Sequence, residues 1–150
     1  MTKFRNLEEL LAAAGSDLGS SRTIILDQPR VDTFADITED RQWIHTDQER
    51  AAEGPFGTTI AHGFYTLSLV APFLEDLLEV EGVSSAVNYG LNKVRFPSAV
   101  PTGSELSAKG TLGSVAATTA GAEATVNVII ERTGGTKPVC VAEVIIRYFH

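Results

Sequence analysis

The sequence is poor in cysteine: Cys140 is the only one among 150 residues. A single cysteine excludes a disulfide within the chain, which is consistent with the reducing environment of the cytoplasm. Cys140 lies in the apolar run VCVAEVII (139–146), where cysteine commonly acts as a small buried hydrophobic residue. We therefore expect Cys140 to pack in the core rather than to react as a thiol.

Basic residues are also few, because 12 lysines and arginines stand against 19 aspartates and glutamates and leave a net charge of −7. A nucleic-acid-binding protein needs a basic surface, so this class is disfavoured. No apolar stretch reaches the ~20 residues that span a bilayer. The first residues, MTKFRNLEELLAAAG, also lack the apolar segment of a signal peptide. The sequence thus predicts one cytoplasmic domain over residues 1–150, with no membrane or nucleic-acid partner.

Motifs for metals and cofactors are missing as well. The three histidines, His45, His62 and His150, are scattered along the chain and form no ligand cluster at a recognised spacing. Neither a Gly-x-Gly-x-x-Gly motif nor a P-loop occurs, which disfavours a nucleotide cofactor. We expect neither a metal nor a cofactor.

The hydrophobic pattern changes from helical to strand-like near residue 83. Before it, the pattern predicts a short N-terminal helix, a strand at 21–27, a helix from Asp27 to about Thr38 and a short helix capped by Asp47. After it, four β-rich segments follow without intervening helices, at 85–96, 105–115, 122–132 and 139–149. This order indicates an α+β fold with a mostly antiparallel sheet.

The segment 62–80, HGFYTLSLVAPFLEDLLEV, is the longest helical candidate. It is apolar almost all round as far as Val70, which is typical of a helix buried on every side. Pro72 should kink or divide this helix, because its ring clashes with the carbonyl four residues earlier. We expect the sheet to pack around it.

Asp40 and His45 are candidates for an acid/base pair. On a regular helix, five residues of separation would place them about 140° apart. They can face the same point only if the segment between them is a turn, which the polar sequence EDRQ permits. The alternative is a surface turn in which His45 is solvated.

Gly63 lies in TTIAHGF (58–64), at the expected start of the long helix. Backbone N–H groups at this position have no acceptor within the helix and can stabilise developing negative charge. Equally, Gly63 could simply allow a tight turn. His62 could be catalytic or could be a packed residue at the helix start, and His150 is terminal.

Lys93 and Arg95 lie in NKVRFP (92–97) and should point to the same face of a strand. Two cations on one face could bind phosphates, although a solvated strand face is the commoner reason for such a pair.

Three segments in this order resemble the MaoC-like (R)-specific enoyl-CoA hydratases, in particular the branch that includes nodulation protein N. They are FADITEDRQWIH (34–45), GPFGTTIAHGF (54–64) and NYGLNKVRFPSAVPTGSEL (88–106). The aspartate, the aliphatic residue before the histidine, and the histidine of the family motif are kept. Glu39 stands where the family has glycine, Gln42 where it has asparagine and Trp43 where it has proline.

This resemblance implies a hotdog fold, in which an antiparallel sheet wraps a long central helix, usually in a homodimer. It implies (R)-specific, reversible hydration of a trans-2-enoyl-CoA thioester, with Asp40 and His45 as the catalytic pair. We expect Asp40 to act as the base toward water and His45 as the proton donor to C2, although a coupled pair could share these roles. The Gly63 N–H would hold the thioester oxygen. No cofactor is needed, since CoA is part of the substrate.

The substrate itself suggests further contacts. CoA carries several negative charges, for which Lys93 and Arg95 are the candidate partners, followed by Lys109. Phe64, Tyr65 and Leu67 could line the acyl tunnel near the reacting carbons.

Three alternatives remain open. A hotdog thioesterase would hydrolyse the thioester, and a non-catalytic module would only bind it. A dehydratase acting on acyl-carrier-protein esters would run the same reaction on a different carrier.

Overall fold

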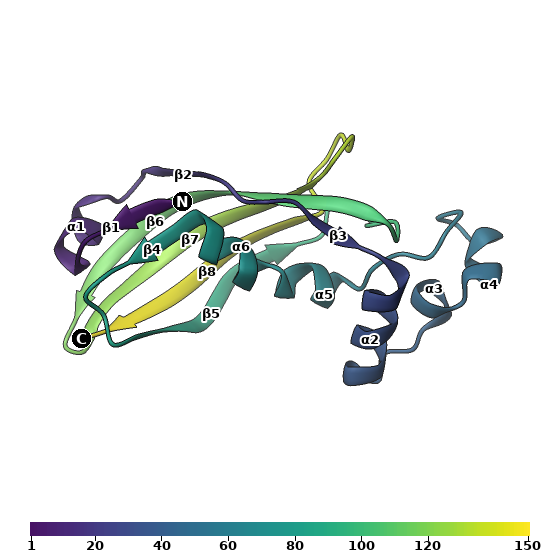
Figure 1. Ribbon diagram of the computed structural model, residues 1–150, viewed down its shortest axis with the longest axis horizontal. Coiled ribbons are helices and arrows are strands. Elements are labelled where there is room, and N and C mark those ends of the chain that lie inside the picture. Colours follow the sequence, from purple (N-terminus) through teal and green to yellow (C-terminus); the bar gives the residue numbers. More distant parts are fainter.

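The computed structural model describes all 150 residues, in which a curved sheet carries helices on one face and at one end (Figure 1). The elements, in chain order, are β1 (Thr2–Phe4), α1 (Leu7–Ala12), β2 (Asp17–Ser20), β3 (Ile24–Leu26), α2 (Gln28–Thr38), α3 (Trp43–Thr46), α4 (Gln48–Ala52), α5 (Gly63–Ser68), α6 (Val70–Leu77), β4 (Leu78–Val80), β5 (Ser85–Arg95), β6 (Ser104–Thr118), β7 (Gly121–Arg132) and β8 (Cys140–Phe149).

The main sheet has six strands and is antiparallel, with the order β2-β6-β7-β8-β5, and β3 also pairs with β6. The four predicted strands after residue 83 are confirmed as β5 to β8. A feature that the sequence pattern did not predict is the short parallel pair of β1 with β4. β5 forms one edge of the sheet and has no partner strand on its outer side.

Buried and more exposed residues alternate along the strands, so that one face of the sheet packs into the core. From Ala122 onward, the buried residues of β7 and β8 occur at every second position, as the two-residue period of a strand requires: Ala122, Ala124, Val126, Val128, Ile130, Cys140, Ala142, Val144, Ile146 and Tyr148. They pack with Phe73 and Leu77 of α6, both fully buried. Cys140 is part of this core, where burial raises the pKa of its thiol to about 11, so the expectation of an unreactive cysteine holds.

The central helix matches its prediction in one respect and differs from it in two. It is divided at Leu69 into α5 and α6, three residues before Pro72, so the expected division is confirmed. It ends at Leu77 rather than at Val80, because residues 78–80 form β4 and pair with β1. It is also not buried on every side within this chain: the side chain of Phe64 is 75% exposed.

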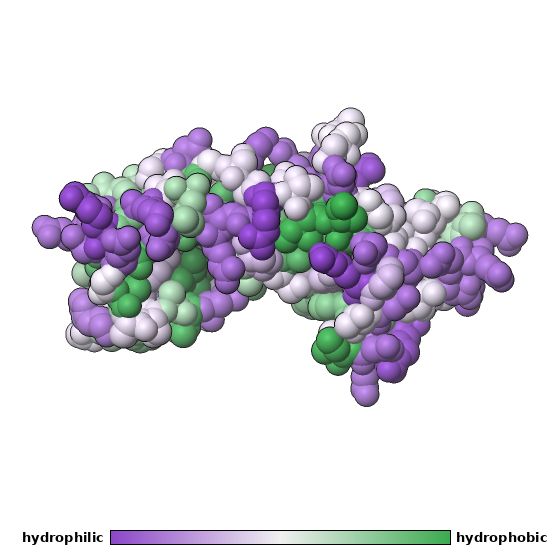
Figure 2. Space-filling view, viewed as in Figure 1, coloured by the Kyte–Doolittle hydropathy of each residue, from purple (hydrophilic) through white to green (hydrophobic).

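The surface seen in Figure 2 is mostly hydrophilic and is interrupted by separate hydrophobic patches. Among the helices of the structure, none has the length and apolar character that crossing a membrane requires.

Candidate active site

The segment that carries Asp40 is a turn between two helices. The Asp27 side chain accepts a hydrogen bond from the Arg30 amide and starts α2, and Glu39 ends it in a left-handed conformation with φ 61° and ψ 13°. Residues 40–42 are not helical, and α3 begins at Trp43. The predicted turn between Asp40 and His45 is therefore confirmed, and it frees the two side chains from helical spacing.

His45 is buried, and its ring is fixed by a main-chain contact. Its Nδ1 lies 2.7 Å from the carbonyl oxygen of Ile60. A carbonyl only accepts hydrogen bonds, so Nδ1 carries the hydrogen and Nε2 of the neutral ring is left as an acceptor. Burial lowers the pKa of His45, and His62 lowers it further, whereas the Ile60 carbonyl and Asp40 act in the opposite direction. Burial outweighs them, and the neutral form is favoured.

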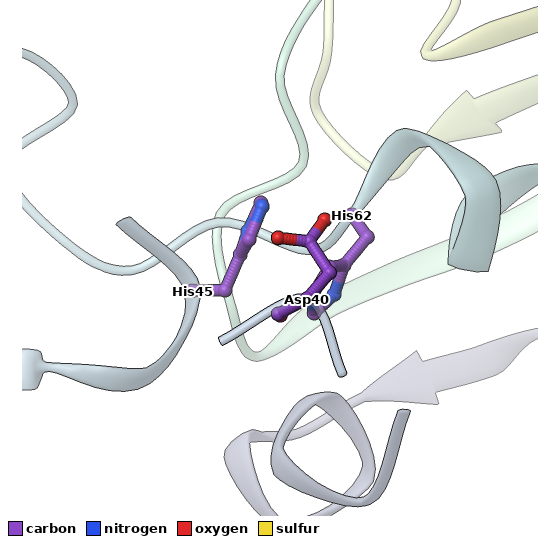
Figure 3. A group of neighbouring side chains, drawn as sticks. All are labelled: Asp40, His45 and His62. Carbon is purple, nitrogen blue, oxygen red and sulfur yellow. The ribbon is translucent and has the colours of Figure 1, made fainter. Parts of the chain in front are cut away.

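Asp40, His45 and His62 come together in space, with one polar side-chain atom of each residue within 4.8 Å of those of the other two (Figure 3). The rings of His45 and His62 are stacked, with centroids 3.8 Å apart. The Nε2–H of His62 donates to the main-chain carbonyl of Asp40 at 2.9 Å. Two of the histidines that are scattered in the sequence are thus neighbours in the fold.

A shared metal ion fits this cluster poorly. A metal binds an imidazole nitrogen in the plane of the ring, at about 2.0–2.1 Å for zinc. The rings of His45 and His62 are stacked, with centroids 3.8 Å apart and an interplanar angle of 25°. No point therefore lies in the planes of both rings and within a metal–nitrogen bond length of a nitrogen of each. In addition, His45 Nδ1 and His62 Nε2 already face main-chain carbonyls.

Gly63 and His45 line the same cavity, which has a volume of about 330 Å³. The other lining residues are mostly apolar: Phe56, Ile60, Ala61, Thr66, Phe96, Pro97, Ser98, Ala99, Val100 and Val139. The first hydrogen bond of α5 runs from the Thr66 amide to the His62 carbonyl, so the Gly63 amide has no acceptor within the helix. α5 has only six residues, so the dipole of a long buried helix does not act at this position. The Gly63 N–H can stabilise negative charge through the hydrogen bond that it donates to a bound group.

A side chain at position 63 would meet the ring of Phe96. A Cβ there would lie 3.3 Å from two ring carbons of Phe96, closer than ordinary van der Waals contact. The absence of a side chain at Gly63 thus leaves room for the Phe96 ring beside this residue.

Four other residues predicted from the sequence are not brought to this cavity. Phe64 is exposed, and Tyr65 stacks on Phe34, with ring centroids 4.9 Å apart, beside a separate open pocket. Lys93 and Arg95 share one face of β5, as predicted, opposite Glu143 and Val141. This is the face turned away from the core, because the alternate residues Ala142 and Val144 of β8 are buried.

The remaining candidates also lie apart from it. Lys109 forms an ion pair with Glu131 at 2.7 Å, and His150 is exposed at the C-terminus.

Two residues near the site had weaker or no signals in the sequence. His62 stood in the AHGF segment, but the spacing did not connect it with Asp40, 22 residues earlier. Gln28 was not considered: its Nε2 donates to the main-chain oxygen of His45 at 2.8 Å, and its Oε1 accepts from the Thr59 hydroxyl at 2.6 Å. A glutamine at the start of a helix carries no signal of such a contact.

The comparisons with known proteins agree with this fold and identify the family. Residues 10–133 match the sequence profile of the MaoC like domain. The chain is 50% identical over 149 residues to 3-hydroxyacyl-thioester dehydratase Z of Mycobacterium tuberculosis, covering 99% of both chains. It is 46% identical over 103 residues to nodulation protein N of Rhizobium leguminosarum bv. viciae, covering 67% of this chain and 64% of that protein.

Solved structures show the same architecture. The (R)-hydratase from A. caviae involved in PHA biosynthesis matches with a TM-score of 0.73 and 24% identity, covering 89% of this chain and 95% of that one. The fold and the polar cluster therefore define a hotdog protein of the dehydratase class. The chain belongs to the MaoC-like dehydratase family.

Proposed function

We propose that this protein catalyses the (R)-specific, reversible hydration of a trans-2-enoyl-CoA thioester to a 3-hydroxyacyl-CoA. The observation that carries the proposal is the meeting of the Asp40 and His45 side chains, next to a cavity that both His45 and Gly63 line. Relatives named as 3-hydroxyacyl-thioester dehydratase and (R)-hydratase support the same reaction class.

The Gly63 amide is the proposed donor to the thioester oxygen. Addition of hydroxide to C3 of the enoyl group moves negative charge onto this oxygen and makes the transition state enolate-like. An N–H that points at this oxygen in a site shielded from water stabilises the charge, and loss of one such donor typically costs about 3–4 kcal/mol.

The protonation state of His45 favours one division of roles. A neutral His45 with its hydrogen on Nδ1 has none on Nε2 to donate, so the proposal takes the proton that C2 receives from the added water. In this assignment, Asp40 orients the water. His45 Nε2 removes a proton from the water and transfers that proton to C2. The water O–H bond breaks, the C3–O and C2–H bonds form, and the C2–C3 double bond becomes single. This assignment revises the roles expected from the sequence, in which Asp40 was the base.

The proposal places the reacting end of the substrate at the cavity and needs no cofactor. Ile60, Val100 and Phe96 supply apolar surface for the acyl group there. Lys93 and Arg95 remain the proposed partners of the CoA phosphates, since both are exposed and Arg95 directly precedes Phe96 in the chain. Contacts of Phe64 and Tyr65 with the acyl chain also remain a prediction.

The protein is further proposed to act as a homodimer in the cytoplasm. Strand β5 supports this assembly, because it is an 11-residue edge strand whose N–H and C=O groups lack a partner on one side. Val87, Tyr89 and Leu91 expose apolar surface on this strand, at 44%, 55% and 39%. A long apolar edge of this kind is stabilised by pairing with a second copy.

The reaction is tested by incubating the protein with crotonyl-CoA and following two signals together. Hydration removes the enoyl absorbance without release of a free thiol, and chiral analysis of the product should give (R)-3-hydroxybutyryl-CoA. Thiol release without hydration would identify a thioesterase, and binding without turnover would identify a binding module; either result rejects the proposal. Rates on matched crotonyl-CoA and crotonyl-acyl-carrier-protein esters decide which carrier is used.

The two side chains are tested by Asp40→Asn and His45→Gln. Each change removes a group that handles the water, so we expect turnover to fall by at least about 10²-fold. His150→Gln is the matched control, because it removes an exposed imidazole far along the chain and should retain the wild-type rate. Wild-type turnover in both site variants would show that the reaction does not depend on this pair.

A further inference from the structure

We propose that His62 is a positioning residue, which holds the main chain of Asp40 so that its carboxylate meets the water beside His45. This inference rests on the proposed function, because the position of Asp40 matters for the rate only if Asp40 takes part in the reaction. It adds a third side chain to the two that the family resemblance indicates.

The contact that carries the inference is the hydrogen bond from His62 Nε2–H to the Asp40 carbonyl, at 2.9 Å. Asp40 itself is exposed and lies in a non-helical turn, directly after a residue in the left-handed conformation. The only other side-chain contacts from outside this turn to its carbonyls come from the Thr46 hydroxyl, at 3.4–3.5 Å to Gln42 and Arg41. His62 is therefore the main side-chain anchor of this turn.

The surroundings of His62 fix both its ring and its tautomer. The residue is 2% exposed. Its ring stacks on the ring of His45 and also lies against the ring of Phe34 in α2, with a centroid distance of 5.0 Å. Its Nδ1 is buried and has no hydrogen-bond partner. A hydrogen on Nδ1 would thus be buried without an acceptor, whereas a hydrogen on Nε2 meets the Asp40 carbonyl.

His62 also links the turn to the other two parts of the site. It is the residue at the N-cap of α5, directly before Gly63, and its carbonyl accepts the first hydrogen bond of that helix. Its ring lies against the ring of His45. His62 is therefore joined to all three parts of the site: by its ring to His45, by Nε2–H to the main chain of Asp40, and by the peptide bond to Gly63. Displacement of a reacting group by about 1 Å can cost on the order of 10²-fold in rate, so this restraint should be visible in turnover.

Two substitutions separate the hydrogen bond from the ring. His62→Gln retains a donor in a position similar to Nε2 but loses the ring, whereas His62→Phe retains a ring but loses the donor. We expect His62→Phe to lower kcat for crotonyl-CoA by about 10–100-fold with KM changed less than about threefold, and His62→Gln to stay within about fivefold of wild type. Equal losses in the two variants would overturn the proposal, because the donor would then not matter.

A double-mutant cycle separates positioning from a general structural effect. Once Asp40→Asn has removed the carboxylate, its placement no longer matters, so adding His62→Phe should lower the residual rate by less than about threefold. The same 10–100-fold loss in both backgrounds would overturn the proposal.

The tautomer provides a readout that does not depend on activity or on how the variants fold. In the wild-type protein, long-range ¹H–¹⁵N correlation spectra of the imidazoles should show His62 protonated on Nε2, and a hydrogen on Nδ1 alone would overturn the proposal. A wild-type protein that does not hydrate crotonyl-CoA would reject the proposed function, and therefore any role of His62 in it, even with the expected tautomer. Failure of the His62 variants in an active enzyme would reject only the positioning role.

Discussion

Glu39 occupies an unfavourable backbone conformation directly before Asp40. It is the only residue other than glycine with a positive φ, at 61°. The left-handed region costs a residue with a side chain roughly 1–2 kcal/mol, and glycine almost nothing. The residue ends α2 and turns the chain toward the polar cluster, so the strain lies where the site needs a sharp change of direction.

Glu39→Gly should therefore be tolerated. Relief of the left-handed strain outweighs the larger entropy of glycine in the unfolded chain, so we expect the free energy of unfolding to rise by up to about 1 kcal/mol. The measurement is urea denaturation, with Glu53→Gly as the control. Glu53 likewise ends a short exposed helix but has φ −92°, so the same change there should lower the free energy of unfolding by a few tenths to 1 kcal/mol. Equal destabilisation at both positions would show that the conformation at Glu39 is not strained.

The residues of the site differ in how far the sequence reveals them. Asp40 and His45 were predicted because both lie in one short polar segment whose turn could be read from its composition. The contact of His62 with Asp40 could not be predicted from spacing, because it joins a side chain to a main-chain carbonyl of a distant segment. Every residue has a main-chain carbonyl, so the residue type does not indicate which carbonyl accepts a side-chain hydrogen bond.

Gln28 connects elements that are far apart in the sequence. Lying at the start of α2, it donates to the carbonyl of His45 in α3 and to Asp32, and it accepts from the buried Thr59 hydroxyl. The same Thr59 hydroxyl lies 2.9 Å from Thr102 Oγ1. One amide thus fixes α3, and with it His45, relative to α2 and to the segment that precedes α5.

Gln28→Leu should weaken this connection. The change leaves the His45 carbonyl and the Thr59 hydroxyl without this partner, so we expect a loss of about 1–3 kcal/mol in the free energy of unfolding and a lower kcat for crotonyl-CoA. Gln48→Leu is the matched control: Gln48 lines the same surface pocket, but its side chain makes no hydrogen bond in the structure. Thermal unfolding and initial rates measure both effects, and equal behaviour of the two leucine variants would contradict the role of Gln28.

At the level of elements, local signals were sufficient for most of the fold. The caps at Asp27 and Asp47 and the alternation in β7 and β8 are encoded within a few residues and were predicted. Strand β4 was predicted as the end of a helix, because LEV continues the apolar pattern of the preceding residues. Its conformation depends on pairing with β1, which lies more than 70 residues earlier, and this interaction overrides the local preference.

The whole molecule has one conspicuous unpaired feature, the edge formed by β5. Isolated chains usually protect such an edge with charges, proline or a covering segment. Here the strand is 11 residues long, and most of its residues are exposed on both faces. This edge and the exposed Phe64 are the surfaces that a second copy would cover in the proposed dimer.

The proposed dimer predicts a particle of twice the 16.0 kDa chain mass in light scattering coupled to gel filtration. Val87→Glu should shift this particle toward the monomer, because a twofold pairing through β5 would bring two added carboxylates into one interface. The folded chain itself can accommodate the change, since Val87 lies directly opposite Arg147 of β8, which offers an opposite charge. Ile37→Glu is the matched control: Ile37 is 77% exposed on α2 and should leave the mass unchanged. A wild-type monomer, or a dimer that both variants retain, would exclude β5 as the interface.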